Sequence, residues 1–179
     1  MYKILIVDDE SIEREGISFL IEKYKLPLEV AQATNGKTAL EYMRTHPIDI
    51  LLTDVKMPQM DGLELARHTF EKYPDVRILV FSAYGEFEFA KKAMAAQAVS
   101  YLLKPIEVDE FQRVMAQILA RCDELAEKKK DEQQRGEENR QQLLFRLVTG
   151  TGLGKAHIPV ECFPFVRSFC GTLDDVVGR

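Results

Sequence analysis

Cysteine and histidine are scarce in this 179-residue sequence, which has three of each. The cysteines are widely spaced and odd in number, which favours reduced thiols in a cytoplasm over a disulfide framework. The histidines are far from one another, and the sequence contains no cluster of cysteines and histidines, so no zinc-binding set is visible. The residues concerned are Cys122, Cys162 and Cys170, and His46, His68 and His157.

Other absences narrow the choice further. No apolar run approaches the length needed to cross a bilayer, and the first apolar run is interrupted at Asp8, too early for a signal peptide. The net charge is −5 and no basic cluster stands out, so nothing in the charge pattern indicates binding to nucleic acid or to an anionic membrane. We therefore expect a cytoplasmic protein without a membrane partner.

Five short apolar runs alternate with helical patterns in the first part of the chain. Continuous apolar strands predict a sheet that is covered on both faces, and their alternation with helices predicts parallel pairing through right-handed crossovers. The expected class is therefore α/β, with a doubly wound five-stranded parallel sheet. The strands are expected at 2–8, 28–34, 48–54, 76–82 and 99–103, and the helices at 11–24, after a cap at Asn35, at 62–73 after a cap at Asp61, and at 86–97.

A different pattern follows Ile106. Apolar residues spaced by three or four predict a helix that extends from the domain, and residues 127–142 contain no apolar residue at all. The spaced apolar residues form a stripe along this helix. We expect Phe111, Met115 and Ile118 to close the core, and Cys122 and Leu125 to continue the stripe beyond the domain. The expected divisions are a domain at 1–125, a charged helical linker at 126–148, and a poorly defined tail at 149–179.

Polar residues stand where four of the predicted strands end. Because the carboxyl ends of parallel strands meet at one edge of a sheet, these residues are expected to converge there. Two carboxylates about 4 Å apart repel by about 4 kcal/mol at an effective dielectric constant near 20, so a cluster of three requires a cation. Mg²⁺ suits carboxylate oxygens, and a lysine nearby can hold an anion. The residues are Asp8 and Asp9, Asp54, Ser82, and Lys104.

Carboxylate, Mg²⁺ and lysine around one cavity make a phosphoryl-binding site, in which an aspartate can itself be the nucleophile. Each residue alone also has a plainer interpretation. Asp9 is a possible helix cap, Ser82 a possible strand-end hydroxyl bonded to backbone, and Tyr101 a possible half-buried strand aromatic. The combination with Asp54 and Lys104 favours the site.

The ordered set "DDE" (8–10), "TDVKMPQMDG" (53–62), "SA" (82–83) and "KP" (104–105) resembles the bacterial response-regulator receiver domain, over roughly residues 1–125. The resemblance implies a flavodoxin-like fold and a phosphoacceptor at Asp54. It also implies a Mg²⁺ site and a set of phosphoryl-binding and switch residues, with a cis Lys104–Pro105 bond. The metal residues are Asp8, Asp9, Asp54 and the Lys56 carbonyl; the switch residues are Ser82, Ala83, Tyr101, Lys104 and Pro105.

The same resemblance implies a function. Residues 84–106 look most like receivers that precede an AraC-type helix-turn-helix output domain. The expected protein is a phosphorylation-operated switch of a two-component system rather than a metabolic enzyme. A sensor histidine kinase would be its partner, and phosphorylation would favour a homodimer through helix 86–97, the last strand and the helix that follows. DNA would be bound only through an output domain missing from this chain.

Two enzyme-like alternatives fit less well. A haloacid-dehalogenase-like Mg²⁺-dependent phosphotransferase places Asp-x-Asp after its first strand, whereas this chain has adjacent Asp8 and Asp9. A flavodoxin-like electron carrier has a phosphate loop rich in Ser, Thr and Gly, and the acidic "DDESIER" (8–14) would repel a phosphate there.

Overall fold

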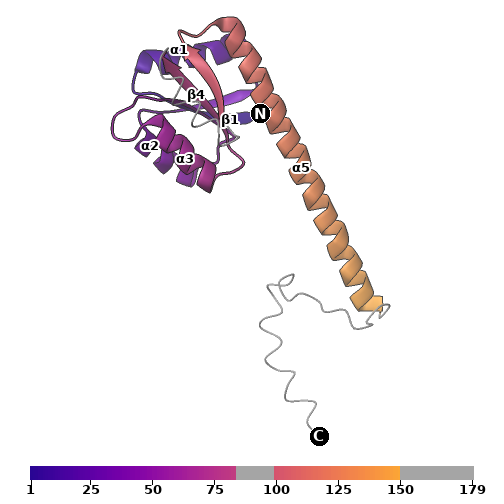
Figure 1. Ribbon diagram of the computed structural model, residues 1–179. Helices are drawn as coiled ribbons and strands as arrows, with labels where there is room; N and C mark the ends of the chain where they lie inside the picture. Colours follow the sequence, from indigo (N-terminus) through magenta and orange to yellow (C-terminus); the bar gives the residue numbers. More distant parts are fainter. Residues whose placement is uncertain (84–98, 150–179) are drawn as a thin grey trace. The chain divides into compact units, whose positions relative to one another are not determined.

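Five strands form one parallel sheet in a computed structural model that describes residues 1–83 and 99–149 (Figure 1). The order across the sheet is β2-β1-β3-β4-β5. The predicted α/β class and parallel pairing are therefore confirmed, with strand limits that differ by one or two residues from those expected. The strands are β1 (Tyr2–Val7), β2 (Leu28–Ala33), β3 (Ile50–Asp54), β4 (Arg77–Ala83) and β5 (Val99–Lys104).

Within residues 1–83 and 99–149, four helices accompany the sheet, and two of them begin at the caps that the sequence predicts. Asn35 accepts a hydrogen bond from the Thr38 amide at 2.9 Å, and Asp61 accepts one from the Glu64 amide at 2.7 Å. The expected helix at 86–97 and the tail beyond Thr149 lie outside the described residues. The helices are α1 (Ser11–Lys23), α2 (Gly36–Thr45), α3 (Gly62–Lys72) and α5 (Val108–Thr149).

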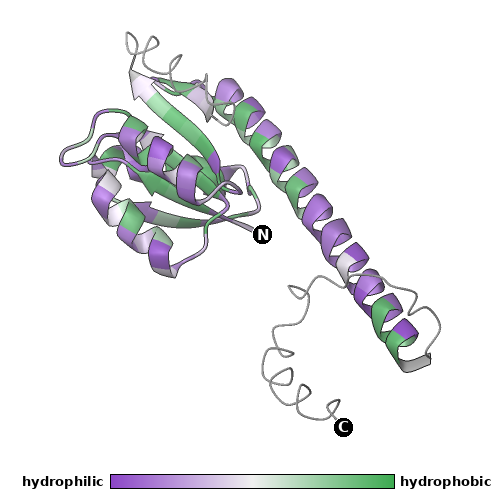
Figure 2. Ribbon diagram, turned by 60° about the horizontal axis from the view of Figure 1, so that its bottom comes forward, coloured by the Kyte–Doolittle hydropathy of each residue, from purple (hydrophilic) through white to green (hydrophobic). Residues whose placement is uncertain are grey.

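Both faces of the sheet are covered, as its nearly continuous apolar strands require (Figure 2). Alternate residues of β1 point to opposite faces, so Ile4 and Ile6 meet one set of helices while Leu5 and Val7 meet the other. The first face is covered by α1 and the start of α5, and the second by α2 and α3. Core contacts on the two faces come from Ile17, Ile21, Phe111 and Met115, and from Ala39, Met43, Leu65 and Ala66.

The start of α5 closes the core with the side chains that the sequence predicts. Phe111, Met115 and Ile118 are buried against the sheet. The expectation that Cys122 lies beyond the core is wrong: it is 5% exposed and packs in the same cluster, because the stripe continues for one more turn before the chain becomes polar. Burial raises the pKa of the Cys122 thiol to about 11, which keeps it protonated.

Two compact units divide the chain, Met1–Lys129 and Lys130–Arg179. In the first unit, Lys129 of α5 forms a 2.8 Å ion pair with Asp75 in the loop before β4. The domain and linker limits expected from the sequence, at 125 and 148, stay predictions. Within 1–83 and 99–149, no helix has the length and apolar character to span a membrane.

Close backbone approach explains the Asp-Gly pair that opens α3. A side-chain carbon at Gly62 would lie 1.7 Å from the carbonyl oxygen of Asp54 and 2.8 Å from Thr53 Oγ1. The Gly62 amide also donates to the Val55 carbonyl at 2.9 Å. Helix α3 is thus held directly against the residue that ends β3, and only glycine fits there.

We expect Gly62→Ala to lower the free energy of unfolding by about 1–3 kcal/mol, because the added methyl must displace the backbone at Asp54. Gly16→Ala is the matched control, since a carbon at Gly16 in α1 meets nothing within 4 Å. That exposed helical change should raise stability by about 0.5–1 kcal/mol. Urea unfolding of both variants measures the difference, and equal effects at the two glycines would contradict the close approach.

Candidate functional site

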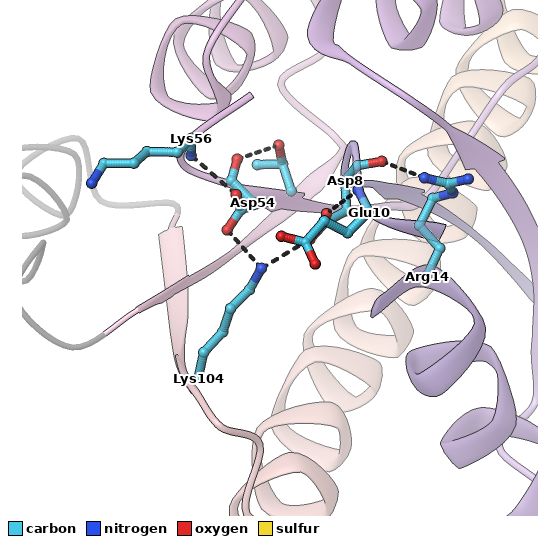
Figure 3. A network of polar contacts seen from close by, with 7 residues as sticks. Asp8, Glu10, Arg14, Asp54, Lys56 and Lys104 are labelled. Carbon is cyan, nitrogen blue, oxygen red and sulfur yellow. Dashed lines mark hydrogen bonds and ion pairs between the residues drawn. The ribbon is translucent and has the colours of Figure 1, made fainter. Parts of the chain in front are cut away.

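Three polar strand ends meet at the carboxyl edge of the sheet, at the position where the strand order reverses. Strand β1 lies between β2 and β3, so the chain leaves it in opposite directions on its two sides. In open α/β sheets this switch point is where ligands bind. Asp8 follows β1, Asp54 ends β3 and Lys104 ends β5, and Figure 3 shows their side chains pointing toward one another.

Lys104 bridges the two aspartates. Its Nζ lies 3.0 Å from Asp8 Oδ2 and 3.1 Å from Asp54 Oδ1. Asp8 is 1% exposed and Asp54 is 8% exposed, so both carboxylates are largely removed from water. The ammonium group also lies 4.7 Å from the centre of the Phe81 ring, close enough for a cation–π contact. One positive charge therefore holds two buried negative charges together.

The two carboxylate oxygens of Asp54 have different partners. Oδ1 faces Lys104, while Oδ2 accepts a hydrogen bond from the Lys56 amide at 3.1 Å. The loop that follows is tightly turned, with the Met60 amide bonded to the Pro58 carbonyl at 2.9 Å and a positive φ of 72° at Gln59. The contacts of Oδ1 with Lys104 and of Oδ2 with the Lys56 amide fix the plane of the Asp54 carboxylate.

Burial and charge oppose each other in this pair. Burial raises the pKa of Asp54, and the charge of Asp8 adds to that rise, while the charge of Lys104 and its hydrogen bond oppose it. For Lys104, burial alone would lower the pKa, but the hydrogen bonds and charges of Asp8 and Asp54 outweigh burial and leave the pKa raised. The lysine is therefore protonated, and burial makes the ionised form of Asp54 less favourable than it is in water.

Asp9 completes a set of three carboxylates. Asp8, Asp9 and Asp54 each offer one oxygen, and these oxygens lie within 4.8 Å of one another. Asp9 is exposed, and with Lys56 and Pro58 it borders an open hollow of about 470 Å³. Two buried carboxylates and one exposed carboxylate, with a lysine beside them, suit a hard divalent cation that keeps several of its waters, such as Mg²⁺.

The other residues expected at the site lie on β4 and β5 or just after them. Ser82 is buried on β4, in register with Leu103, and Tyr101 is half-buried on β5, in register with Val80. Ala83 ends β4 and pairs with Lys104, whose bond to Pro105 is cis as expected. The strand positions agree with the sequence, and the switch roles of these residues stay predictions.

Sequence reasoning missed two residues that contact this cluster. Arg14 of α1 donates from Nη1 to the Asp8 carbonyl at 2.7 Å, and Phe81 lies beneath Lys104. A basic residue one turn into a helix that begins beside carboxylates was a usable signal for Arg14. Phe81 directly precedes Ser82 and is paired with Asp54 across the sheet, but its apolar character gave it only a core role.

Comparisons with known proteins agree with this geometry. A family model described as the response regulator receiver domain matches residues 4–116. The uncharacterized transcriptional regulatory protein YesN of Bacillus subtilis is 41% identical over 121 residues, which cover 67% of this chain and 33% of YesN. The transcriptional regulatory protein DegU of Brevibacillus brevis is 31% identical, over 64% of this chain and 50% of its own length.

Solved structures give the same result. The receiver domain of AraT, a response regulator from Geobacillus stearothermophilus, is 38% identical with a TM-score of 0.63, covering 72% of this chain and 98% of that one. A two-component transcriptional regulator AraC from Clostridium phytofermentans is 35% identical with a TM-score of 0.65, over 69% and 97% of the two chains. The chain spans about a third of the length of YesN and about half of that of DegU.

The raised pKa of Asp54 predicts a gain in stability when the charge is removed. Because the pKa of Asp54 is higher in the folded than in the unfolded chain, its ionisation destabilises the folded state. This destabilisation develops as the pH rises from the ordinary pKa of 3.8 through the raised pKa. Asp54→Asn should therefore unfold at a higher urea concentration than the parent at pH 7 in the presence of a chelator. The gain should shrink as the pH falls through the raised pKa and disappear near the ordinary value.

Asp131→Asn provides the control, because it removes the same formal charge from an exposed position of α5. It should leave the urea midpoint nearly unchanged across the same pH range. A stabilisation by Asp54→Asn that persists unchanged at low pH would contradict the assignment of strain to the ionised carboxylate.

Proposed function

The chain belongs to the response regulator receiver family, and on that premise we propose that Asp54 accepts a phosphoryl group from a sensor histidine kinase. Response regulators are signalling proteins, so the proposed role is that of a phosphorylation-operated switch and not of a metabolic enzyme. The observation that carries the proposal is the bridge from Lys104 to Asp8 at 3.0 Å and to Asp54 at 3.1 Å. It combines a nucleophile with a group that binds anions.

Asp54 is prepared as the nucleophile. Its carboxylate is held by the Lys56 amide on one oxygen and by Lys104 on the other, while its side chain keeps 11% of its surface open. An Asp54 oxygen forms a bond to phosphorus as the bond from phosphorus to the donor breaks, and the electron pair of that bond leaves with the donor. The product is an acyl phosphate on Asp54, and the fixed carboxylate plane favours in-line attack.

Lys104 supplies the positive charge for the transferred group. Its ammonium can exchange its contact with Asp54 Oδ1 for a phosphoryl oxygen while it keeps its contact with Asp8. Asp8, Asp9 and Asp54, with the Lys56 carbonyl, would hold the Mg²⁺ ion, and Ser82 and Tyr101 would respond to the phosphoryl group. When bound, Mg²⁺ supplies the charge that offsets the repulsion between the carboxylates and the phosphoryl oxygens.

Exposed apolar side chains on α1 support a protein as the phosphoryl donor. Ile12 is 73% exposed and Phe19 is 61% exposed, and the two residues lie on the same face of α1. Gly16 lies between them and leaves open space above the helix. Ile12 is three residues from Asp9, so a helical partner on this face of α1 would lie near Asp9, which borders the open hollow.

Control of transcription is the proposed output. YesN and DegU, both named as transcriptional regulatory proteins, are about three times and about twice as long as the matched region. We infer that this receiver acts in the cytoplasm through an AraC-type DNA-binding domain of such a longer protein. A homodimer formed on phosphorylation would pass the signal on, through β5, α5 and the segment expected to form helix 86–97.

The direct test is intact-mass spectrometry after incubation with acetyl phosphate. We expect the parent protein to gain one phosphoryl group when Mg²⁺ is present and none in a chelator. Asp54→Asn should gain none under either condition, because its amide is not a nucleophile. Equal labelling of the Asn variant and the parent would show that another residue is the acceptor.

Lys104→Ala separates metal binding from phosphoryl binding. Without the ammonium, the carboxylates repel each other by about 4 kcal/mol at 4 Å and an effective dielectric constant near 20, so Mg²⁺ should still bind and should stabilise this variant more than the parent. Beryllofluoride, a phosphoryl mimic, should no longer change its near-ultraviolet spectrum. Lys128→Ala, an exposed change of the same charge, should behave as the parent. Loss of Mg²⁺ binding in Lys104→Ala would contradict this division of roles.

A further inference from the structure

We propose that Arg14 is a positioning residue of the metal site: its guanidinium fixes the peptide between Asp8 and Asp9, and thereby the direction of the Asp9 carboxylate. Arg14 touches neither the metal ion nor the phosphoryl group and acts through the backbone. This inference rests on the proposed function, because it assigns a residue to the Mg²⁺ site that phosphorylation requires. The contacts of Arg14 and the lack of other contacts at Asp9 support this role.

Every other polar group of Asp8 already has a partner. Its amide donates to the Ala33 carbonyl at 3.3 Å, one carboxylate oxygen accepts from the Glu10 amide at 2.8 Å, and the other faces Lys104. Arg14 takes the remaining group, the carbonyl, from Nη1 at 2.7 Å, as Figure 3 shows. A peptide is planar, so a fixed carbonyl oxygen also fixes the nitrogen and Cα of the next residue, Asp9.

Asp9 has no such support of its own. Its side chain is exposed, and within the described part of the chain it makes no hydrogen bond or ion pair. Its carboxylate nevertheless offers an oxygen within 4.8 Å of those of Asp8 and Asp54. The backbone at the Asp8–Asp9 peptide is therefore what aims this ligand at the cluster, and Arg14 is the side chain that holds that peptide.

Arg14 is itself braced against β2. Its Nε donates to Gln32 Oε1 at 3.2 Å, and Gln32 Nε2 donates to Ser18 Oγ at 3.0 Å. Ser18 Oγ in turn donates to the carbonyl of Arg14 at 2.7 Å, which closes a ring of contacts between α1 and β2. The planar guanidinium can meet Gln32 and the Asp8 carbonyl at once, because its donors point in fixed directions.

The charge of Arg14 would have the opposite effect on a cation. A positive group beside three carboxylates repels Mg²⁺, so on charge alone its removal would tighten Mg²⁺ binding. If Arg14 instead acts by positioning Asp9, its removal would leave the Asp9 carboxylate less well fixed and would weaken Mg²⁺ binding. The two explanations differ in sign, and a measured affinity therefore decides between them.

Isothermal titration calorimetry with Mg²⁺ provides that affinity. Residues that orient metal ligands typically change affinity by about 10–100-fold, and we expect about tenfold weaker binding for Arg14→Ala, because three other contacts still hold Asp8. Arg14→Lys can still donate to the Asp8 carbonyl and should recover most of the affinity. Arg44→Ala removes the same charge from an exposed position in the last turn of α2 and should match the parent. Equal or tighter binding by Arg14→Ala would overturn the proposal.

A second variant and a parallel test of the parent protein distinguish a failure of the Arg14 role from a failure to fold or a failure of the proposed function. Gln32→Ala removes the brace and keeps the arginine, so it should weaken Mg²⁺ binding even if Arg14→Ala fails to fold, and unchanged binding in a folded Gln32→Ala would then overturn the inference. The parent is titrated and phosphorylated in parallel. If the parent neither binds Mg²⁺ nor gains a phosphoryl group, the proposed function fails; if the parent does both and Arg14→Ala binds Mg²⁺ equally well, only the role of Arg14 fails.

Discussion

One ammonium group holds together carboxylates that would otherwise repel each other. Lys104 Nζ lies 3.0 Å from Asp8 and 3.1 Å from Asp54, and both aspartates are almost fully buried. Removing Lys104 would leave two buried carboxylates without their counter-charge, which is strongly destabilising. A divalent cation or a phosphoryl group that binds here therefore changes the electrostatic free energy of these three groups. This makes the arrangement suited to a switch, because the ligand alters the partners of Lys104 and not the fold.

The rest of the domain serves to bring these three charges to one place. Strands β1, β3 and β5 bring Asp8, Asp54 and Lys104 to the same edge of the sheet. The strand order reverses at β1, so this edge is also where the switch point lies. Gly62 lets α3 begin directly against Asp54, and Arg14 secures the opposite side of the site from α1. Rigid elements on all sides keep the carboxylates close although they repel.

The sequence predicted the sheet and the site because both depend on strongly patterned features. Continuous apolar strands, the caps at Asn35 and Asp61, and polar residues at strand ends all have local signals. The contact of Phe81 with Lys104 had no such signal. The signal for Arg14, a basic residue one turn into a helix that begins beside carboxylates, does not show which group its side chain reaches. Cys122 was placed outside the core because periodicity does not show where the sheet stops covering a helix.

A crystal structure of the protein with Mg²⁺ and beryllofluoride tests the central claim most directly. We expect a bond between beryllium and an Asp54 oxygen, and a metal ion held by Asp9 and Asp54. Lys104 should have moved from Asp54 Oδ1 to a fluorine while it keeps its contact with Asp8. A structure in which both ligands are absent from this edge of the sheet, or in which Lys104 still bridges Asp8 and Asp54 with beryllofluoride bound, would contradict it.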